Sequence, residues 1–340
     1  LSPSFANTHT HVGMFNLRGA FEEMELMPWL ESIWPIEDEM TAEDVYKASL
    51  ESLKEMVASG ITLFNDMYMF PESVVKAAEE IGVRGFIGKG IVDSDLDKRL
   101  EEMKRLKNEW ENKELINPTI APHAIYTCSE ETLLKSKELS KKLGLPIHIH
   151  LSETRKEVSD CYQKTEKRPV EYLDSIGFLD ENVIAAHCGW LTKNEIKILG
   201  ERNVKISHCP VSNMKLAVGG EMPLPELMKN NLISLGTDGP ASNNSQSMFD
   251  TMKFASLLHK HKRWDPTIAK SKDIFNMATI NGYKTFGLDN SIKEGNIADL
   301  VLLDIEKLKP FDKDRIINHL VYSCDSSVVV KTICNGKSCL

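Results

Sequence analysis

Histidine and carboxylate side chains recur where short apolar runs of this sequence end, and together they could hold a metal ion. His9 and His11 are two residues apart in the run 4–11, so in a β-strand both rings point to one face and can chelate one cation. Imidazole nitrogens with a carboxylate such as Asp238 are the ligand set expected for Zn²⁺ or a similar divalent metal with an open position. Six further residues of these types end similar runs: Asp66, His123, His150, Glu153, His187 and His208.

The joint pattern is more specific than any single motif. A lone His-x-His in a strand is more often a pair of hydrogen-bonded core histidines than a metal site. However, seven of the ten histidines lie at or within three residues of the end of a predicted strand. His148 shares a strand face with His150 one pleat deeper, and we expect it to be a hydrogen-bonded core residue rather than a ligand. Clustering of this kind predicts a metal-dependent catalytic site.

Eight short β-branched and apolar runs alternate with segments of helical periodicity, which predicts an α/β fold, a (β/α)8 TIM barrel. No Gly-x-Gly-x-x-Gly motif follows any strand, which argues against a Rossmann fold. Because the carboxyl ends of barrel strands form the active site, the residues named above should meet on one rim. The predicted strands lie within residues 4–11, 61–67, 84–92, 116–123, 145–153, 183–188, 204–209 and 232–238.

The alternation of strand-like and helix-like segments gives way to strand-like segments near the C-terminal end of the sequence. Residues 1–290 are predicted to form the barrel, and residues 291–340 to form the C-terminal part of a small β-sandwich domain. The stretches 288–305 and 328–338 have the composition of its strands. The chain opens almost directly on the first barrel strand, so we expect the N-terminal strands that would complete this domain to be absent.

Composition narrows the class of partner. The 340 residues include 41 basic and 50 acidic side chains, which give a formal charge of −9, and charges of both signs are mixed along the chain. This composition disfavours nucleic acid as a binding partner. No apolar run approaches the roughly 20 residues of a membrane span, and no signal-peptide pattern opens the chain. Seven cysteines without a CxxC pair predict no disulfide framework. We expect a cytoplasmic protein that binds a small molecule and does not bind a membrane. Whether it forms a homo-oligomer is left open.

The strand-end motifs resemble those of the metal-dependent amidohydrolase superfamily. They are NTHTHVGM (7–14), HIHLSET (148–154), AAHCGW (185–190), SHCPVSNMKL (207–216) and LGTDGPASNNS (235–245). Three more motifs narrow the resemblance to deaminases of S-adenosylhomocysteine, 5′-methylthioadenosine and 5′-deoxyadenosine: WPIED (34–38), GKGIVDS (88–94) and APHAIYTCSEE (121–131). The resemblance covers essentially the whole chain and implies a hydrolase that converts adenosine-type nucleosides to the inosine-type product and ammonia.

The same resemblance implies roles for individual residues. The implied metal ligands are His9, His11, His150 and Asp238. The implied catalytic residues are Glu153, which moves a proton, His187, which orients water, and Asp238, which accepts the water proton. The implied substrate-binding residues are Glu37, Lys89, Arg99, His123 and Glu153. Glu37 would contact the ribose, and Arg99 would contact a carboxylate of the substrate. Lys89 occupies a position where some relatives carry a second arginine. Strand four ends without the lysine that bridges two metals in binuclear relatives, so one divalent ion is expected, Zn²⁺ or else Fe²⁺ or Mn²⁺.

Two alternatives stay open at this point. Within the enzyme class, the same ligands serve deaminases of guanine or pterins and hydrolases of triazines. In another class, the chain would be a catalytically silent barrel that acts as an interaction scaffold. An intact ligand set together with Glu153 disfavours the silent barrel.

Overall fold

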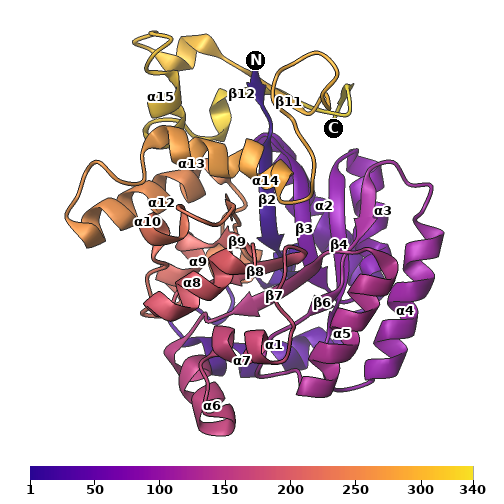
Figure 1. Ribbon diagram of the computed structural model, residues 1–340. Coiled ribbons are helices and arrows are strands. Elements are labelled where there is room, and N and C mark those ends of the chain that lie inside the picture. Colours follow the sequence, from indigo (N-terminus) through magenta and orange to yellow (C-terminus); the bar gives the residue numbers. More distant parts are fainter. Residues whose placement is uncertain (340) are drawn as a thin grey trace.

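Parallel strands wrapped into a closed barrel form the centre of the computed structural model, which describes residues 1–339 (Figure 1). They pair in two runs, β2 to β5 with β6 beside β4, and β7 to β10. All eight predicted strands are present, the fourth as two short pieces, and the TIM-barrel prediction is confirmed. The strands are β2 (Phe5–Thr10), β3 (Ile61–Tyr68), β4 (Arg84–Ile91), β5 (Ile116–Pro118), β6 (Ala121–Pro122), β7 (Ile147–Leu151), β8 (Val183–His187), β9 (Lys205–His208) and β10 (Ile233–Leu235).

Main-chain contacts between the two runs of strands close the barrel. The Asp238 N–H, just after β10, donates to the His9 carbonyl of β2 over 2.9 Å. On the other side, Ile120 pairs in parallel with Ile147 of β7. Every residue of β3 is buried, as expected for a strand covered on both faces. The closed geometry brings the carboxyl ends of all strands to one rim.

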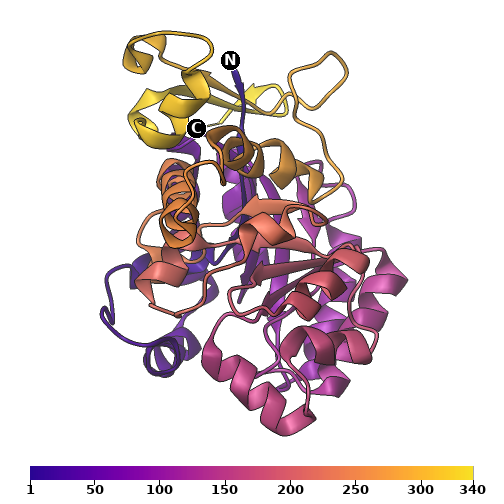
Figure 2. The same ribbon diagram turned by 60° about the vertical axis from the view of Figure 1, so that its left-hand side comes forward.

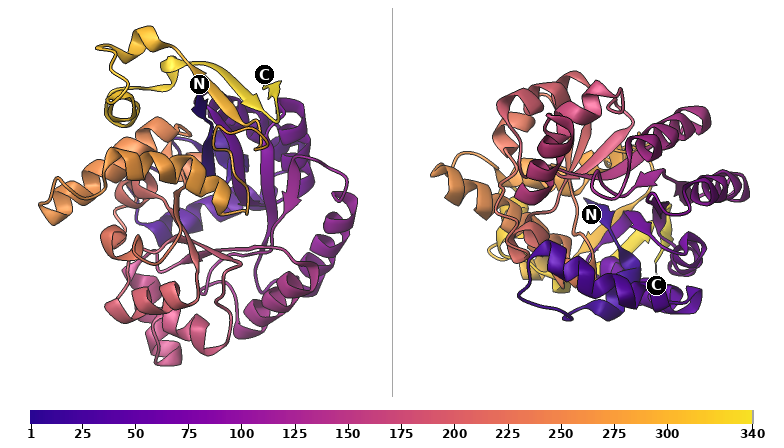
Figure 3. Two further views of the ribbon diagram at one scale, coloured as in Figure 1. Left: turned by 45° about the horizontal axis from the view of Figure 1, so that its top comes forward. Right: turned by 90° about the horizontal axis from the view of Figure 1, so that it is seen from below.

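Helices form an outer ring around the strands, as the views in Figures 2 and 3 show. Their ends follow local signals: Thr41 and Asp44 form a capping box at the start of α2, and Gly82 and Gly144 end α3 and α5 with positive φ of 78° and 65°. The helices are η1 (Val12–Leu17), α1 (Leu26–Glu39), α2 (Ala42–Ala58), α3 (Pro71–Ile81), α4 (Leu96–Glu109), α5 (Glu130–Leu143), α6 (Arg155–Thr165), α7 (Pro169–Ser175), α8 (Lys193–Glu201), α9 (Pro210–Lys215), α10 (Leu224–Leu227), α11 (Pro240–Asn243), α12 (Met248–Arg263), α13 (Ser271–Ala278), α14 (Ile280–Lys284), η2 (Ile305–Leu308), α15 (Ile316–Tyr322) and η3 (Ser326–Val328).

Both ends of the chain contribute to a small antiparallel sheet, where Figure 1 shows the N-terminus beside the yellow C-terminal segment. Its strands, in spatial order, are β1 (Ser2–Pro3), β11 (Leu300–Leu303), β12 (Val329–Cys334) and β13 (Lys337–Ser338). Ser2 pairs with Val301, and Pro3 with Leu300. The expectation that the N-terminal strands of this small domain are absent is therefore wrong for β1, because two residues are too short a run to show a strand pattern in the sequence.

A buried ion pair joins the small sheet to the barrel. Arg84, the first residue of β4, donates through Nε to Asp299 Oδ2 over 3.1 Å. The Tyr283 hydroxyl donates to the same oxygen over 2.7 Å, and the Asn335 N–H donates to Oδ1 over 2.6 Å. Arg84 begins its strand, so this cluster lies at the end of the barrel away from the rim that carries the strand-end histidines.

Two further features bear on the sequence expectations. All seven cysteines have free thiols in the structure, and six of them are buried. Among residues 1–339, no helix combines the length and the apolar composition that a bilayer crossing requires.

Candidate active site

A cavity of about 540 Å³ opens at the carboxyl ends of the barrel strands. This volume is within the range of about 300–1,000 Å³ that is typical of small-molecule sites. Apolar side chains line part of it: Met14, Leu26, Trp29, Leu30 and Leu216. The polar lining contains most of the residues singled out in the sequence: His11, Glu37, Arg99, His123, His150, Glu153, His187 and Asp238.

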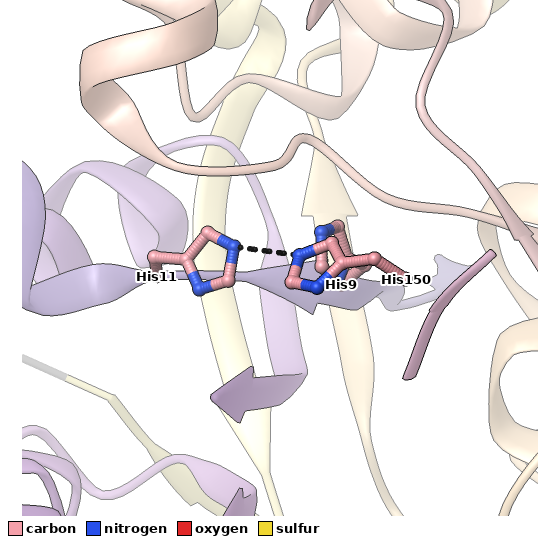
Figure 4. Close-up of side chains that lie close together, drawn as sticks. All are labelled: His9, His11 and His150. Carbon is pink, nitrogen blue, oxygen red and sulfur yellow. Dashed lines mark hydrogen bonds between the residues drawn. The ribbon is translucent and has the colours of Figure 1, made fainter. Parts of the chain in front are cut away.

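Four imidazole rings and one carboxylate converge at the inner end of this cavity. The Nε2 atoms of His9 and His11 each lie 3.3 Å from Asp238 Oδ1. His150 Nε2 lies 3.3 Å from His11 Nε2, and Figure 4 shows the rings of His9, His11 and His150 close together. The ligand atoms of His9, His187 and Asp238 also lie within 4.8 Å of one another. The cluster therefore brings five donor groups around one point.

Each ring is held by a contact on its other nitrogen. His11 Nδ1 lies 2.6 Å from the Met67 carbonyl, and His150 Nδ1 lies 2.7 Å from the His123 carbonyl. A carbonyl only accepts, so both Nδ1 atoms carry a proton and both Nε2 atoms are left directed at the centre, as the nitrogens that could bind a cation. Such outer contacts fix the tautomer and orientation of metal-binding histidines.

His9 and His187 have side chains as their outer partners. His9 Nδ1 lies 2.7 Å from His148 Nε2, which confirms that His148 is a hydrogen-bonded core histidine. His187 Nδ1 lies 2.8 Å from Asn213 Oδ1. Both contacts again leave Nε2 directed at the cluster, so all four histidines present the same nitrogen to the same place.

The protonation of this cluster and one nitrogen without a hydrogen-bond partner fit a site for a divalent cation. His9 Nε2 is fully buried and has no hydrogen-bond partner within the described chain. Burial lowers the pKa of His9 to about 4, so its ring is neutral and offers a lone pair at neutral pH. Against the effect of burial, the hydrogen bond and charge of Asp238 raise the pKa of His11 to about 9. Asp238 thus favours positive charge at this point, which a proton on His11 supplies here and a bound metal would supply in its place.

Asp238 is itself held in place by two donors. The Ser212 hydroxyl donates to Oδ2 over 2.6 Å, and the Gly239 N–H donates to Oδ1 over 2.7 Å. Although burial alone would raise it, the close contacts of the His11 and His9 rings keep the pKa of Asp238 well below its usual range. The residue is therefore a carboxylate with one oxygen directed at the histidines.

Glu153 lies beside the cluster and is almost fully buried. Its Oε2 is 3.8 Å from His187 Nε2, and its side chain lines the cavity. Burial raises the pKa of Glu153 above the ordinary glutamate value. A carboxyl group with these properties holds a proton at higher pH than a solvated one, as a general acid requires.

Three side chains line the cavity farther from the cluster. Glu37 Oε1 accepts a hydrogen bond of 2.7 Å from the Tyr68 hydroxyl, and burial raises the pKa of Glu37. His123 Nδ1 lies 2.8 Å from Thr127 Oγ1, and burial with neighbouring histidine charges lowers its pKa to about 3. Arg99 is the one lysine or arginine among the residues that line the cavity in the described chain.

Lys89 does not reach this cavity. Its Nζ donates to Glu102 Oε2 of α4 over 2.5 Å, whereas the next residue, Gly90, lines the cavity. Side chains alternate along β4, so Lys89 is turned toward the helix layer when its neighbour faces the barrel mouth. This placement contradicts the expectation of a substrate contact for Lys89.

Several supporting residues were not foreseen from the sequence. Asn213 and Ser212 belong to a motif that carried the resemblance, yet their own contacts to His187 and Asp238 were not predicted. Tyr68 had a usable signal, because it directly follows the predicted strand 61–67, two residues after Asp66, and so shares the face of Asp66.

Comparisons with known proteins agree with this geometry. A sequence model of the amidohydrolase family matches residues 1–339. The 5′-deoxyadenosine deaminase of Methanothrix thermoacetophila is 41% identical over 337 residues, 98% of this chain and 81% of that protein. That of Methanococcus aeolicus is 43% identical over 345 residues, 98% of this chain and 80% of that protein. The crystal structure of a zinc-bound adenosine deaminase from Xanthomonas campestris superposes with a TM-score of 0.95 at 32% identity, covering 99% of this chain and 79% of that one.

Proposed function

The chain belongs to the amidohydrolase family, and from this premise we propose that it is a hydrolytic deaminase of adenosine-type nucleosides. Its products are the inosine-type nucleoside and ammonia. The observation that carries the proposal is the position of Glu153, a buried acid beside four histidines and Asp238 at the inner end of a nucleoside-sized cavity. The deaminases similar over nearly the whole chain support the same reaction.

We propose that one divalent ion is held by His9, His11, His150 and Asp238, with Zn²⁺ first and Fe²⁺ or Mn²⁺ as alternatives. When bound, such an ion lowers the pKa of a water molecule toward neutrality and makes it a nucleophile. The zinc in the similar adenosine deaminase structure supports the choice of metal. His187 directs Nε2 toward Glu153 and the cluster, where it orients the attacking water by a hydrogen bond.

The proton transfers are assigned to two carboxyl groups. As water adds to C6 of the adenine ring, Asp238 accepts its proton and Glu153 delivers a proton to the adjacent ring nitrogen. The exocyclic nitrogen then takes up the proton held by Asp238 and leaves as ammonia, while the C6 hydroxyl becomes the carbonyl of the product and its proton returns to Glu153. The raised pKa of Glu153 suits the acid role, and the lowered pKa of Asp238 suits the role of a carboxylate.

The remaining lining residues define how the nucleoside is held. Glu37 keeps acceptor capacity for the ribose hydroxyls, since Tyr68 occupies only one of its oxygens. His123, directly after β6, contacts the base or ribose. Arg99 is positioned to meet a carboxylate on the 5′ substituent. With Lys89 turned away, Arg99 is the one lysine or arginine that the described residues place on the cavity lining, so 5′-deoxyadenosine and 5′-methylthioadenosine should be turned over at least as well as S-adenosylhomocysteine.

The test is a substrate panel with two independent readouts. Metal-loaded protein is incubated with adenosine, 5′-deoxyadenosine, 5′-methylthioadenosine and S-adenosylhomocysteine, and with guanine, a pterin and a triazine as comparison substrates. Ammonia release and the hypoxanthine nucleoside are both measured. Turnover of the adenosine-type compounds supports the proposal. Exclusive turnover of a comparison substrate, or none at all, would overturn it.

A further inference from the structure

Glu157 is a buried carboxylate that the proposed reaction does not use, although it lies against the turn that carries Glu153. Its side chain is 3% exposed. Oε1 accepts a hydrogen bond of 2.8 Å from the Ser152 N–H, and Oε2 accepts one of 2.7 Å from the Glu153 N–H. Ser152 has a φ of +51°, the left-handed region that a residue with a side chain rarely adopts. Both oxygens therefore hold consecutive main-chain donors of a strained turn.

Glu157 is the third residue of helix α6, and two other helices of this chain show what an acidic residue at that position ordinarily does. Helices α2 and α8 also start after a threonine and carry an acidic residue at the third helical position. Asp44 accepts from the N–H of its own cap Thr41 over 3.0 Å, and Glu195 accepts from the N–H of Thr192 over 2.8 Å. Both are capping boxes, which satisfy the free donors of a helix start.

Helix α6 departs from this arrangement at one point. Thr154 still caps the helix, because its Oγ1 accepts from the Glu157 N–H over 3.1 Å. The Glu157 carboxylate, however, reaches past Thr154 to the two residues before it. The side chain is therefore placed to hold the turn between β7 and α6 rather than to complete the cap.

We infer that Glu157 is a positioning residue that fixes the main chain at Ser152 and Glu153 and so holds the Glu153 carboxyl group at the metal cluster. This inference rests on the proposed function, in which Glu153 moves a proton. Two acceptor oxygens are needed, since two N–H groups point at them. A glutamine offers one acceptor oxygen and places an NH₂ group against the other N–H, so Glu157→Gln keeps the shape of the side chain and loses one contact.

The experiment compares E157Q with the wild type and with D44N, which removes an acidic capping residue that does not line the cavity. Steady-state kinetics with 5′-deoxyadenosine, metal content and thermal unfolding are measured for each. We expect E157Q to lower kcat roughly 10- to 100-fold, the effect of a small misplacement of a reacting group, with KM and metal content nearly unchanged. D44N should keep the wild-type kcat.

A double-mutant cycle distinguishes positioning from general damage. If Glu157 acts through Glu153, E157Q lowers kcat in the wild-type background but not in the E153Q background. Equal losses in both backgrounds, a wild-type kcat in E157Q, or a matching loss in D44N would each overturn the inference. Where E157Q does not fold, E157D replaces it, and its kcat must also fall only when Glu153 is present. A wild-type protein that releases no ammonia would instead refute the proposed function.

Discussion

Replacing Arg99 by alanine should separate substrates by the charge on their 5′ substituent. Arg99 lies in the first turn of α4, where Nη1 donates to the Gly90 carbonyl over 2.7 Å and Nε donates to the Ser94 carbonyl over 2.9 Å. These two bonds hold the guanidinium group at the cavity wall and leave other N–H donors free for a ligand. A carboxylate on the substrate is the natural partner of such a group.

The magnitude follows from the two kinds of bond that the substitution removes. A hydrogen bond to a charged group contributes about 1.5–3 kcal/mol, which corresponds to roughly 10- to 150-fold in kcat/KM for S-adenosylhomocysteine. Losing the bonds to Gly90 and Ser94 also loosens the loop after β4. That second effect is common to all substrates, so the ratio of kcat/KM between S-adenosylhomocysteine and 5′-deoxyadenosine isolates the carboxylate contact.

Lys89 provides the matched control for this experiment. It is a cation in the same part of the chain, but its ion pair with Glu102 holds it away from the cavity. Lys89→Ala should therefore leave the substrate ratio unchanged, while Arg99→Ala lowers it. The reasoning is refuted if Arg99→Ala affects both substrates equally or neither, or if Lys89→Ala changes the ratio as Arg99→Ala does.

Three further predictions concern the acid, the ribose contact and the base of the barrel. Glu153→Gln should retain the metal and lower kcat by roughly 10² to 10⁴, measured by kinetics alongside metal analysis; unchanged turnover would reassign the proton carrier. 2′-Deoxyadenosine should be a markedly poorer substrate than adenosine, since leaving an acceptor of Glu37 unpaired costs about 1–3 kcal/mol; equal kcat/KM values would contradict the ribose contact. Asp299→Ala leaves the buried charge of Arg84 without its partner and should lower the free energy of unfolding by about 3–5 kcal/mol, measured by denaturant unfolding. An unchanged midpoint would show that this ion pair does not stabilise the contact between the small sheet and the barrel.

Much of the fold was predictable because each barrel strand is a short, mostly buried run with a polar residue at its end or within a few residues after it. Helix α1 (Leu26–Glu39), which carries Glu37, is harder to predict from the sequence. Pro35 lies inside that helix, and a proline with three acidic residues after it suggests a break. The helical signal was nevertheless present: Trp29, Leu30 and Ile33 are buried with the spacing of one helix face.

In the candidate site, too, some residues could be predicted from the sequence and others could not. Residues at strand ends could be identified from their order along the chain, because the barrel brings all those ends together. Their outer partners could not, since Asn213 is 26 residues from His187 and His148 is 139 residues from His9. Lys89 was misplaced because the resemblance supplied a position, whereas side-chain alternation along β4 decides which way that position faces.

Metal removal tests the central claim most directly, namely that the histidine and aspartate cluster holds a divalent ion on which deamination depends. The protein is stripped with a chelator, its metal content is measured, and ammonia release from 5′-deoxyadenosine is followed before and after Zn²⁺ is restored. We predict one divalent ion per chain, loss of activity on stripping and recovery with Zn²⁺. Stripped protein that still releases ammonia at the untreated rate would contradict the account.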